Sequence, residues 1–442
     1  MEQNVNQKLL EFISRCPTAW HGAETLASRL RDEGYRELPE YEDWALRPGE
    51  RCFVRRNGSS LIAFRVPRGA FPGFMLMAAH LDSPALAVKQ LETVTGAGQY
   101  AQLGVERYGG MLLAPWLDRP LSVAGRVVVR DGDRLSVRLV NLDRDLLLIP
   151  NLAIHLDRSA NEERRYDVKT DMLPVAGLGG DGLGFRRLVA REAGARAEDI
   201  LSAELRLYVR ERGTVWGMEE EFVSSPRLDD LQCAFACAEG FLQAADGAAL
   251  PLLCLFDNEE VGSGSGQGAD STFLGDTLLR LCRALGLDGS DYRRLLAQSL
   301  MVSADNAHAV HPNHPEVSDR CDRPSLNGGV VIKHNAARRY TTDAVSEALF
   351  AEVCRRAEVP VQHYSNRADL AGGSTLGHIS LSQVSLNSVD IGLPQLAMHS
   401  CYETAGARDT DYLIRAARLF FASALRCVEG GFELLTGEGE GR

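Results

Sequence analysis

The sequence has no apolar run close to the ~20 residues that a membrane-spanning helix requires. Its first residues lack the basic and apolar regions of a secretory signal peptide, and none of its ten cysteines forms a CxxC pair. These features predict reduced thiols in a cytoplasmic protein. An excess of positive charge is also absent, because 60 acidic residues outnumber 48 basic residues and give a net charge of -12. The acidic balance disfavours nucleic acid and anionic membranes as the main partners.

The composition is that of an ordinary globular protein. Hydrophobic residues make up 45% of the 442 residues and charged residues 24%, which is enough apolar material for a sizeable core. Because domains usually contain ~100–200 residues, the length favours two domains. Cys233 and Cys237 lie one helical turn apart and could contribute to a metal site, but two small side chains buried on a helix is the better interpretation.

Continuous apolar runs at 74–79, 252–256 and 300–304 predict buried strands of a largely parallel sheet. Two helices are expected within the first 35 residues. Further helices are expected at 183–196, 229–245, 271–286, 343–358 and 409–427. The residue pattern between 93 and 222 instead indicates mostly β-strands, and 127–140 predicts a hairpin with an Asp-Gly turn. The chain is therefore predicted to be an α/β protein with a mostly β insertion.

Carboxylates or histidine follow each of the three apolar runs. His80 and Asp82 follow the first run, Glu259 and Glu260 the second, and Asp305 the third. Ligand sites in open α/β sheets form at the C-terminal ends of the strands. We therefore expect these side chains to share one crevice.

Several acids in one crevice repel one another, and divalent cations are the usual remedy. Mixed imidazole and carboxylate ligands suit zinc, manganese or cobalt better than magnesium or calcium. Two ions ~3.5–4 Å apart need about three protein ligands each, with one carboxylate able to bridge them. A set that meets this requirement, with Asp229 as the bridge, is His80, Asp229, Glu260, Asp305 and His399.

Two acids remain for other roles. Glu259 is free to act as a general base on activated water. Asp82, two residues after His80, is placed to fix the tautomer of that imidazole.

Each of these signals is weak when taken singly. A Glu-Glu pair is usually a solvated surface, and Asp229-Asp230 is typical of the start of a helix. The glycine-rich run at 262–268 lacks the Lys-Ser/Thr of a phosphate-binding P-loop, so a flexible turn is the better interpretation.

Six segments together form a more specific pattern. They are AAHLDSP at 78–84, YGG at 108–110 with WLDR at 116–119, PRLDD at 226–230, DNEEVGS at 257–263, SADNAHAVHPN at 303–313, and QLAMHS at 395–400. In this order, over nearly the whole chain, they resemble the M18 family of metallo-aminopeptidases, of the aspartyl aminopeptidase type.

The resemblance implies a two-metal exopeptidase that removes N-terminal residues, with a preference for Asp or Glu, from peptide substrates. It assigns His80 and Asp305 to one metal, most readily zinc, and Glu260 and His399 to the other. The implied fold is a mixed sheet with helices on both faces, formed by residues 1–90 and 224–442. A β-rich dimerisation or lid domain at 91–223 would interrupt it.

The family also implies homo-oligomers in which dimers assemble into a dodecamer, and a histidine of the inserted domain reaches the neighbouring subunit's site. The matching residue is His155, for which an ordinary histidine of a β insertion is the alternative. Family matching further places Lys333, Tyr340 and Met398 near the substrate and His308 near the metals. The family usually has Asn where this chain has Asp230, which adds charge beside the bridge.

Two other functions remain open at this point. One is a non-catalytic peptide-binding or shell protein on the same fold. The other is a related two-metal dipeptidase or deacetylase. The complete set of candidate ligands argues against the first, because a degenerate enzyme usually loses its metal ligands.

Overall fold

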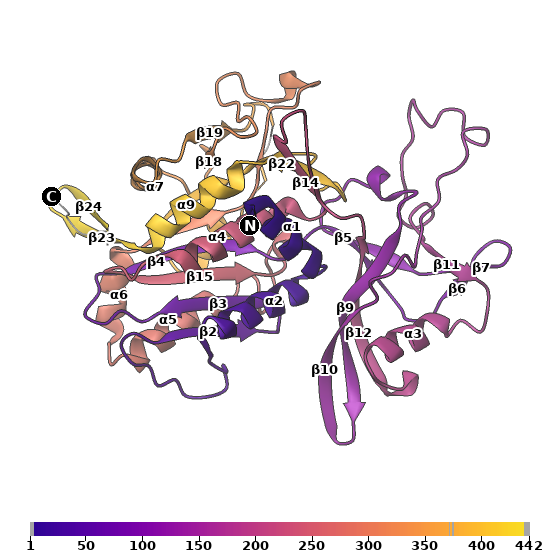
Figure 1. Ribbon diagram of the computed structural model, residues 1–442, viewed down its shortest axis with the longest axis horizontal. Coiled ribbons are helices and arrows are strands. Elements are labelled where there is room, and N and C mark those ends of the chain that lie inside the picture. The colour runs from indigo at the N-terminus through magenta and orange to yellow at the C-terminus, as the bar shows by residue number, and fades with distance from the viewer. Residues whose placement is uncertain (1–3, 371, 374, 437–442) are drawn as a thin grey trace.

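The computed structural model describes residues 4–370, 372–373 and 375–436. Its largest element is a nine-stranded sheet with the strand order β1-β2-β3-β15-β4-β16-β20-β18-β19 (Figure 1). In that order the strands are β1 (Arg36–Glu37), β2 (Arg51–Arg56), β3 (Ser60–Arg65), β15 (Leu250–Phe256), β4 (Phe74–His80), β16 (Leu300–Ala304), β20 (Asn387–Gly392), β18 (Val330–His334) and β19 (Val361–Ser365). The four central strands β15, β4, β16 and β20 are parallel, whereas β3 pairs antiparallel with β15 and β18 with β20. The sheet is therefore mixed.

Helices cover both faces of this sheet. One face packs against α1 (Val5–Arg15), α2 (Ala19–Asp32), α4 (Leu228–Gln243), α7 (Ala344–Arg356) and α9 (Asp409–Phe421). The other packs against α5 (Phe273–Ala284), α6 (Gly289–Ala297) and α8 (Leu376–Gln383). Strand β4 serves both cores, since Met75 and Met77 face the first while Phe74 and Leu76 face the second. Successive residues of a strand point to opposite faces of the sheet. A strand that lies between two hydrophobic cores therefore needs apolar residues at every position, without alternating polar ones.

A second β-rich body lies beside the large sheet (Figure 1). Its five-stranded sheet contains β5 (Ala85–Val88), β8 (Val105–Tyr108), β9 (Leu121–Asp131), β10 (Arg134–Asn141) and β12 (Ile200–Val209), and α3 (Gly184–Glu192) packs on it. Three short strands, β6 (Val94–Thr95), β7 (Tyr100–Gln102) and β11 (Val175–Leu178), form a further sheet. This body has a hydrophobic core of its own. The division at residues 91–223 stays a prediction, and β5 joins the insertion's sheet slightly before that boundary.

A smaller mixed sheet borders the C-terminal ends of the central strands. It has the order β13-β14-β22-β21-β17, with β13 (Thr214–Trp216), β14 (Phe222–Ser225), β22 (Glu403–Gly406), β21 (Pro394–Leu396) and β17 (Ala307–His308). The chain thus returns from the inserted body through β13 and β14 before it enters α4. Among the described residues, no helix combines the length and apolarity needed to cross a bilayer.

The expected helix at 409–427 is wrong in its second part. Helix α9 ends at Phe421, and 423–428 instead forms β23 (Ser423–Val428), which pairs with β24 (Gly431–Thr436). The turn between the two strands contains Gly430 with φ +78°, a conformation that favours glycine. Residues 423–428 are compatible with a helix or with a strand. Their pairing with residues 431–436 selects the strand.

Helices α4 and α9 approach closely at Gly240, which gives a testable packing prediction. A Cβ added there would lie 2.4 Å from the Cβ of Ala417 and 2.9 Å from the backbone nitrogen of Arg418. We expect Gly240→Ala to lower the free energy of unfolding by about 1–3 kcal/mol through overpacking, although alanine is the better helix former. Gly289→Ala is the matched control, because no atom of the described residues lies within 4 Å of its added Cβ, its chain neighbours and own helix aside. Denaturation midpoints compare the two variants, and an undiminished midpoint for Gly240→Ala would contradict the close approach.

Candidate active site

The site begins where three parallel strands end side by side. His80 is the last residue of β4 and pairs in register with Phe256, the last residue of β15. The chain then passes through Asp257 into a short 3-10 turn, Glu259–Val261. On the other side of β4, Asp305 directly follows β16. The parallel register therefore delivers the predicted residues of all three strands to one edge of the sheet.

Asp229 lies at the centre of the cluster, in the first turn of α4 where the backbone departs from helical geometry. Its Oδ1 lies 3.7 Å from Nε2 of His80, and that same nitrogen lies 4.0 Å from Oδ1 of Asp305. Its Oδ2 lies 3.4 Å from Nε2 of His399, which is also 3.4 Å from Oε2 of Glu260. The two oxygens of one carboxylate therefore face two separate groups of ligand-type atoms.

Ligand-type atoms lie within 4.8 Å of one another in each of these groups. One consists of His80, Asp229, Asp230 and Asp305, and the other of Asp229, Glu260 and His399. His80 forms a further group with Glu259 and Glu260. Asp230 is held by the backbone, because the nitrogen of His80 donates to its Oδ2 at 3.0 Å.

Asp82 holds the loop after β15 in place. Its Oδ1 accepts a hydrogen bond from the backbone nitrogen of Glu259 and its Oδ2 from that of Glu260, both at 3.1 Å. The hydroxyl of Tyr108 donates to Oδ2 at 2.8 Å. Nδ1 of His80 lies 3.0 Å from the carbonyl oxygen of Asp82 and 3.5 Å from its carboxylate. Because a carbonyl only accepts, this contact places the ring hydrogen on Nδ1 and leaves the lone pair of Nε2 for the crevice.

Glu403 is a site residue that sequence reasoning missed. It is buried, and its two oxygens accept hydrogen bonds from the backbone nitrogens of His399 at 2.8 Å and of Asp229 at 3.0 Å. Burial raises its pKa to about 8. One carboxylate thus ties the loop that carries His399 to the start of α4. Its position four residues after His399 carries no recognisable signal, because the contact depends on the pairing of β22 with β14.

Glycine allows the inserted body to approach the cluster. Gly109 has φ +79°, and a Cβ there would lie 3.1 Å from Cβ of Glu260. The carbonyl oxygen of the next residue, Gly110, contacts Nδ1 of His399. This contact gives His399 the same arrangement as His80, with Nδ1 bonded to a carbonyl and Nε2 directed at carboxylates.

The charges of the cluster are unbalanced without cations. Burial raises the pKa of Glu259 to about 8, and burial together with the neighbouring Asp229 raises the pKa of Glu260 well above its usual value. Burial lowers the pKa of His80, but the carboxylate of Asp230 and other nearby acids outweigh it, so that the pKa is raised. Oδ1 of Asp229 and Oε1 of Glu260 are buried, and no described residue donates a hydrogen bond to either oxygen. Unsatisfied buried oxygens beside imidazole nitrogens fit divalent ions that prefer mixed nitrogen and oxygen ligands.

A cavity of about 660 Å³ opens beside the cluster. Four of its lining residues are those that family matching assigned to the substrate or the metals, namely His308, Lys333, Tyr340 and Met398. Nζ of Lys333 lies 3.5 Å from Oδ2 of Asp305, donates to the carbonyl oxygen of Asn306 at 2.8 Å, and lies 5.7 Å from the centre of the Tyr340 ring. The ammonium group of Lys333 therefore joins the cluster to the cavity wall.

His155 is not brought to this cavity within the subunit. It is exposed, in the segment between β10 and β11, and is absent from the residues that line the cavity. Its expected role in a neighbouring subunit stays a prediction.

The chain matches known proteins along nearly its whole length. Residues 12–421 match the family described as "Aminopeptidase I zinc metalloprotease (M18)". A "Probable M18 family aminopeptidase 2" from Clostridium novyi is 41% identical over 422 residues, which cover 94% of this chain and 98% of the relative. The protein of the same description from Pseudomonas aeruginosa is 43% identical over 432 residues, which cover 96% and 99% of the two chains.

Solved structures agree with the sequence relatives. A chain of the cryo-EM Ape4 and Nbr1 complex superposes with a TM-score of 0.91 at 37% identity, covering 94% of this chain and 85% of the other. The S. cerevisiae mApe1 dodecamer gives a TM-score of 0.82 at 26% identity, covering 94% and 96%. The chain therefore belongs to the M18 family of aminopeptidases, and it is a metal-dependent hydrolase that removes residues from the ends of peptides.

Proposed function

We propose that the chain cleaves N-terminal residues from peptides with two divalent ions, most readily zinc, held at the cluster around Asp229. The observation that carries this proposal is the position of Asp229, whose two oxygens face two separate groups of ligand-type atoms. His80 and Asp305 would complete one group, and Glu260 and His399 the other. When bound, such a pair of ions polarises the scissile carbonyl and lowers the pKa of water toward ~7.

Glu259 is the proposed general base. Glu259 lines the cavity together with His80 and Asp305, and Asp82 fixes its backbone nitrogen. Glu259 would take the proton of the attacking water and pass it to the leaving amine. Asp82 is proposed as a positioning residue, because its carboxylate holds the backbone nitrogens of Glu259 and Glu260.

The cavity wall is proposed to bind the substrate. A carboxylate of the cluster would hold the free α-amine, which restricts cleavage to the chain end. Lys333 supplies a cation that favours an acidic side chain at the N-terminus of the substrate, and Tyr340 and Met398 would pack against its stem. His308 borders the same cavity and is proposed to contact the peptide near the ions.

A homo-oligomer built from dimers, up to a dodecamer, is proposed on the likeness to mApe1, whose solved form is a dodecamer. In such an assembly the exposed His155 would reach the cavity of a neighbouring subunit and bind the substrate there. A cytoplasmic location is also proposed. All ten cysteines are free of disulfide bonds, as a reducing compartment requires.

Replacing Glu259 tests the catalytic assignment. We expect Glu259→Gln to retain its metal content but to lower turnover by about 10²–10⁴-fold, because the amide cannot accept the proton. Glu198→Gln, at an exposed position outside the site, is the control. Metal analysis and peptide kinetics measure both quantities. Turnover close to that of the control would remove Glu259 from the role of base.

Metal removal tests the cofactor assignment. A chelator should abolish peptidase activity, and zinc, manganese or cobalt should restore it, because the site contains imidazole and carboxylate side chains. Full activity in a chelated sample that metal analysis shows to be free of metal would contradict the proposal.

The same metal analysis applies to a variant of the cluster. We expect His399→Ala to bind one ion fewer at the cluster than the unsubstituted chain.

Substituting Lys333 tests the preference for acidic residues. We expect Lys333→Met to lower kcat/KM on Asp-linked substrates by roughly ten- to a hundred-fold more than on Leu-linked substrates, since a hydrogen bond to a charged group contributes ~1.5–3 kcal/mol. The ratio between the two substrates within one variant corrects for any disturbance of Asp305. An unchanged ratio would exclude Lys333 from the choice of substrate.

A further inference from the structure

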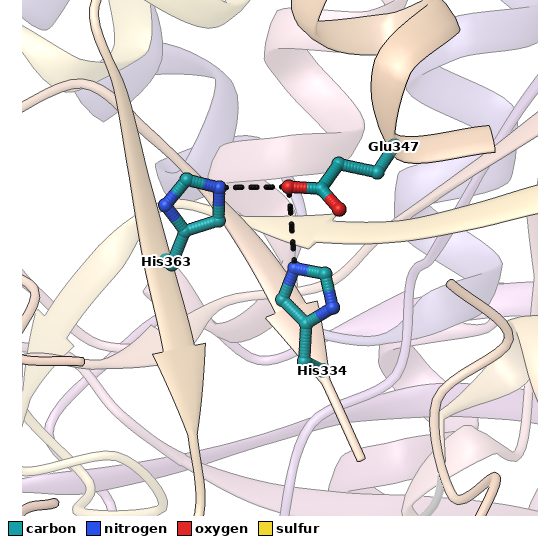
Figure 2. A group of neighbouring side chains, drawn as sticks. All are labelled: His334, Glu347 and His363. Carbon is teal, nitrogen blue, oxygen red and sulfur yellow. Dashed lines mark hydrogen bonds and ion pairs between the residues drawn. The ribbon is translucent and has the colours of Figure 1, made fainter. Parts of the chain in front are cut away.

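Another group of metal-ligating side chains lies outside the cavity, where α7 covers β18 and β19. Nε2 of His363 lies 3.0 Å from Oε1 of Glu347, and Nε2 of His334 lies 3.7 Å from the same oxygen. Figure 2 shows both imidazole rings converging on this carboxylate. The ligand-type atoms of all three residues lie within 4.8 Å of one another.

The register of the two strands explains why these residues meet. Lys333 pairs with Tyr364 across the parallel strands, and Ile332 pairs with His363. Because side chains alternate between faces, Lys333 and Tyr364 point into the cavity, whereas His334 and His363 point to the face that α7 covers. Glu347 lies in the first turn of α7, directly over the two rings.

We propose that His334, Glu347 and His363 bind one divalent transition-metal ion of the zinc class, separate from the ions of the cluster around Asp229. A tetrahedral zinc ion bonded at ~2.0–2.2 Å holds its ligand atoms about 3.4 Å apart. The distances of 3.0 and 3.7 Å from Oε1 of Glu347 lie on either side of that value. Two imidazoles and one carboxylate form a recognised zinc ligand set that leaves a fourth position for water.

The exposure of the group makes it an exchangeable site. The side chains of His334, Glu347 and His363 are 30%, 32% and 46% exposed. An ion can therefore enter from solvent without unfolding of the chain. The ligands also come from three elements, so the ion would join β18, β19 and α7.

The site is placed to influence substrate binding. Strand β19 is the edge of the nine-stranded sheet, and among the strands of the described residues it pairs only with β18. Each histidine is adjacent in sequence to a residue of the cavity wall, His334 to Lys333 and His363 to Tyr364. An ion that fixes the two strands on the α7 face would therefore also fix Lys333 and Tyr364, and its effect on the enzyme should fall on KM more than on kcat.

Zinc binding to the full-length chain tests the proposal. Metal-stripped protein is dialysed against buffered zinc, and the bound zinc per chain is counted for the unsubstituted chain, His363→Ala, His334→Ala and His378→Ala. We expect His363→Ala and His334→Ala each to bind one zinc fewer than the unsubstituted chain. His378→Ala is the matched control, because His378 is exposed but belongs to no metal-ligating group among residues 4–370, 372–373 and 375–436. The difference between variants is the readout, so the test does not depend on how many ions the central cluster holds.

Thermal denaturation provides a second measurement. Zinc should raise Tm more for the unsubstituted chain and His378→Ala than for His363→Ala, since a ligand that binds only the folded state stabilises it. A retained kcat on peptide shows that each variant is folded, because loss of the ion is expected to change KM more than kcat. Equal zinc content in His363→Ala and His378→Ala would overturn the proposal and leave an ordinary hydrogen bond between His363 and Glu347.

Discussion

The repulsion among buried carboxylates around Asp229 is the constraint on which the site depends. Asp229, Asp230, Glu260 and Asp305 lie together at the end of the sheet, and one oxygen of each of the first three is buried with no hydrogen-bond donor in the part of the chain that the structure describes. Such a group tolerates burial only when protons or cations balance its charge. The two imidazoles present Nε2 toward these oxygens because backbone carbonyls occupy their Nδ1 side. The cluster is therefore arranged in advance for ions that accept both nitrogen and oxygen.

The fold supplies the rigidity that this arrangement needs. Strands β4, β15 and β16 are buried between two helical layers, so their C-terminal ends keep a fixed register. Asp82 then attaches the loop after β15 to the end of β4, and Glu403 attaches the loop after β21 to the start of α4, both through backbone hydrogen bonds. Both residues hold candidate metal ligands by their main-chain nitrogens, so that packing and hydrogen bonding offset the electrostatic cost of the site.

Much of the fold and cluster could be predicted from sequence because the relevant signals are local. Unalternating apolar runs followed by polar side chains mark buried parallel strands with candidate metal ligands at their ends, as His80 and Asp305 illustrate. The role of Glu403 and the meeting of His334 with His363 could not be foreseen. Both depend on strand register and on a covering element distant in sequence, which periodicity does not encode. For the same reason the sequence at 423–428 predicts the end of a helix, although its pairing with 431–436 makes it a strand.

The alternation along β18 has a consequence for how this region can change. Lys333 and His334 are consecutive, yet one borders the cavity and the other faces α7. A single-residue insertion or deletion ahead of the strand would reverse both faces at once, placing an imidazole in the cavity and an ammonium under the helix. A change in the length of the preceding loop is thus tolerable only where the loop absorbs it before Val330. A shift of this strand would therefore displace Lys333 from the cavity and His334 from the face under α7 at the same time.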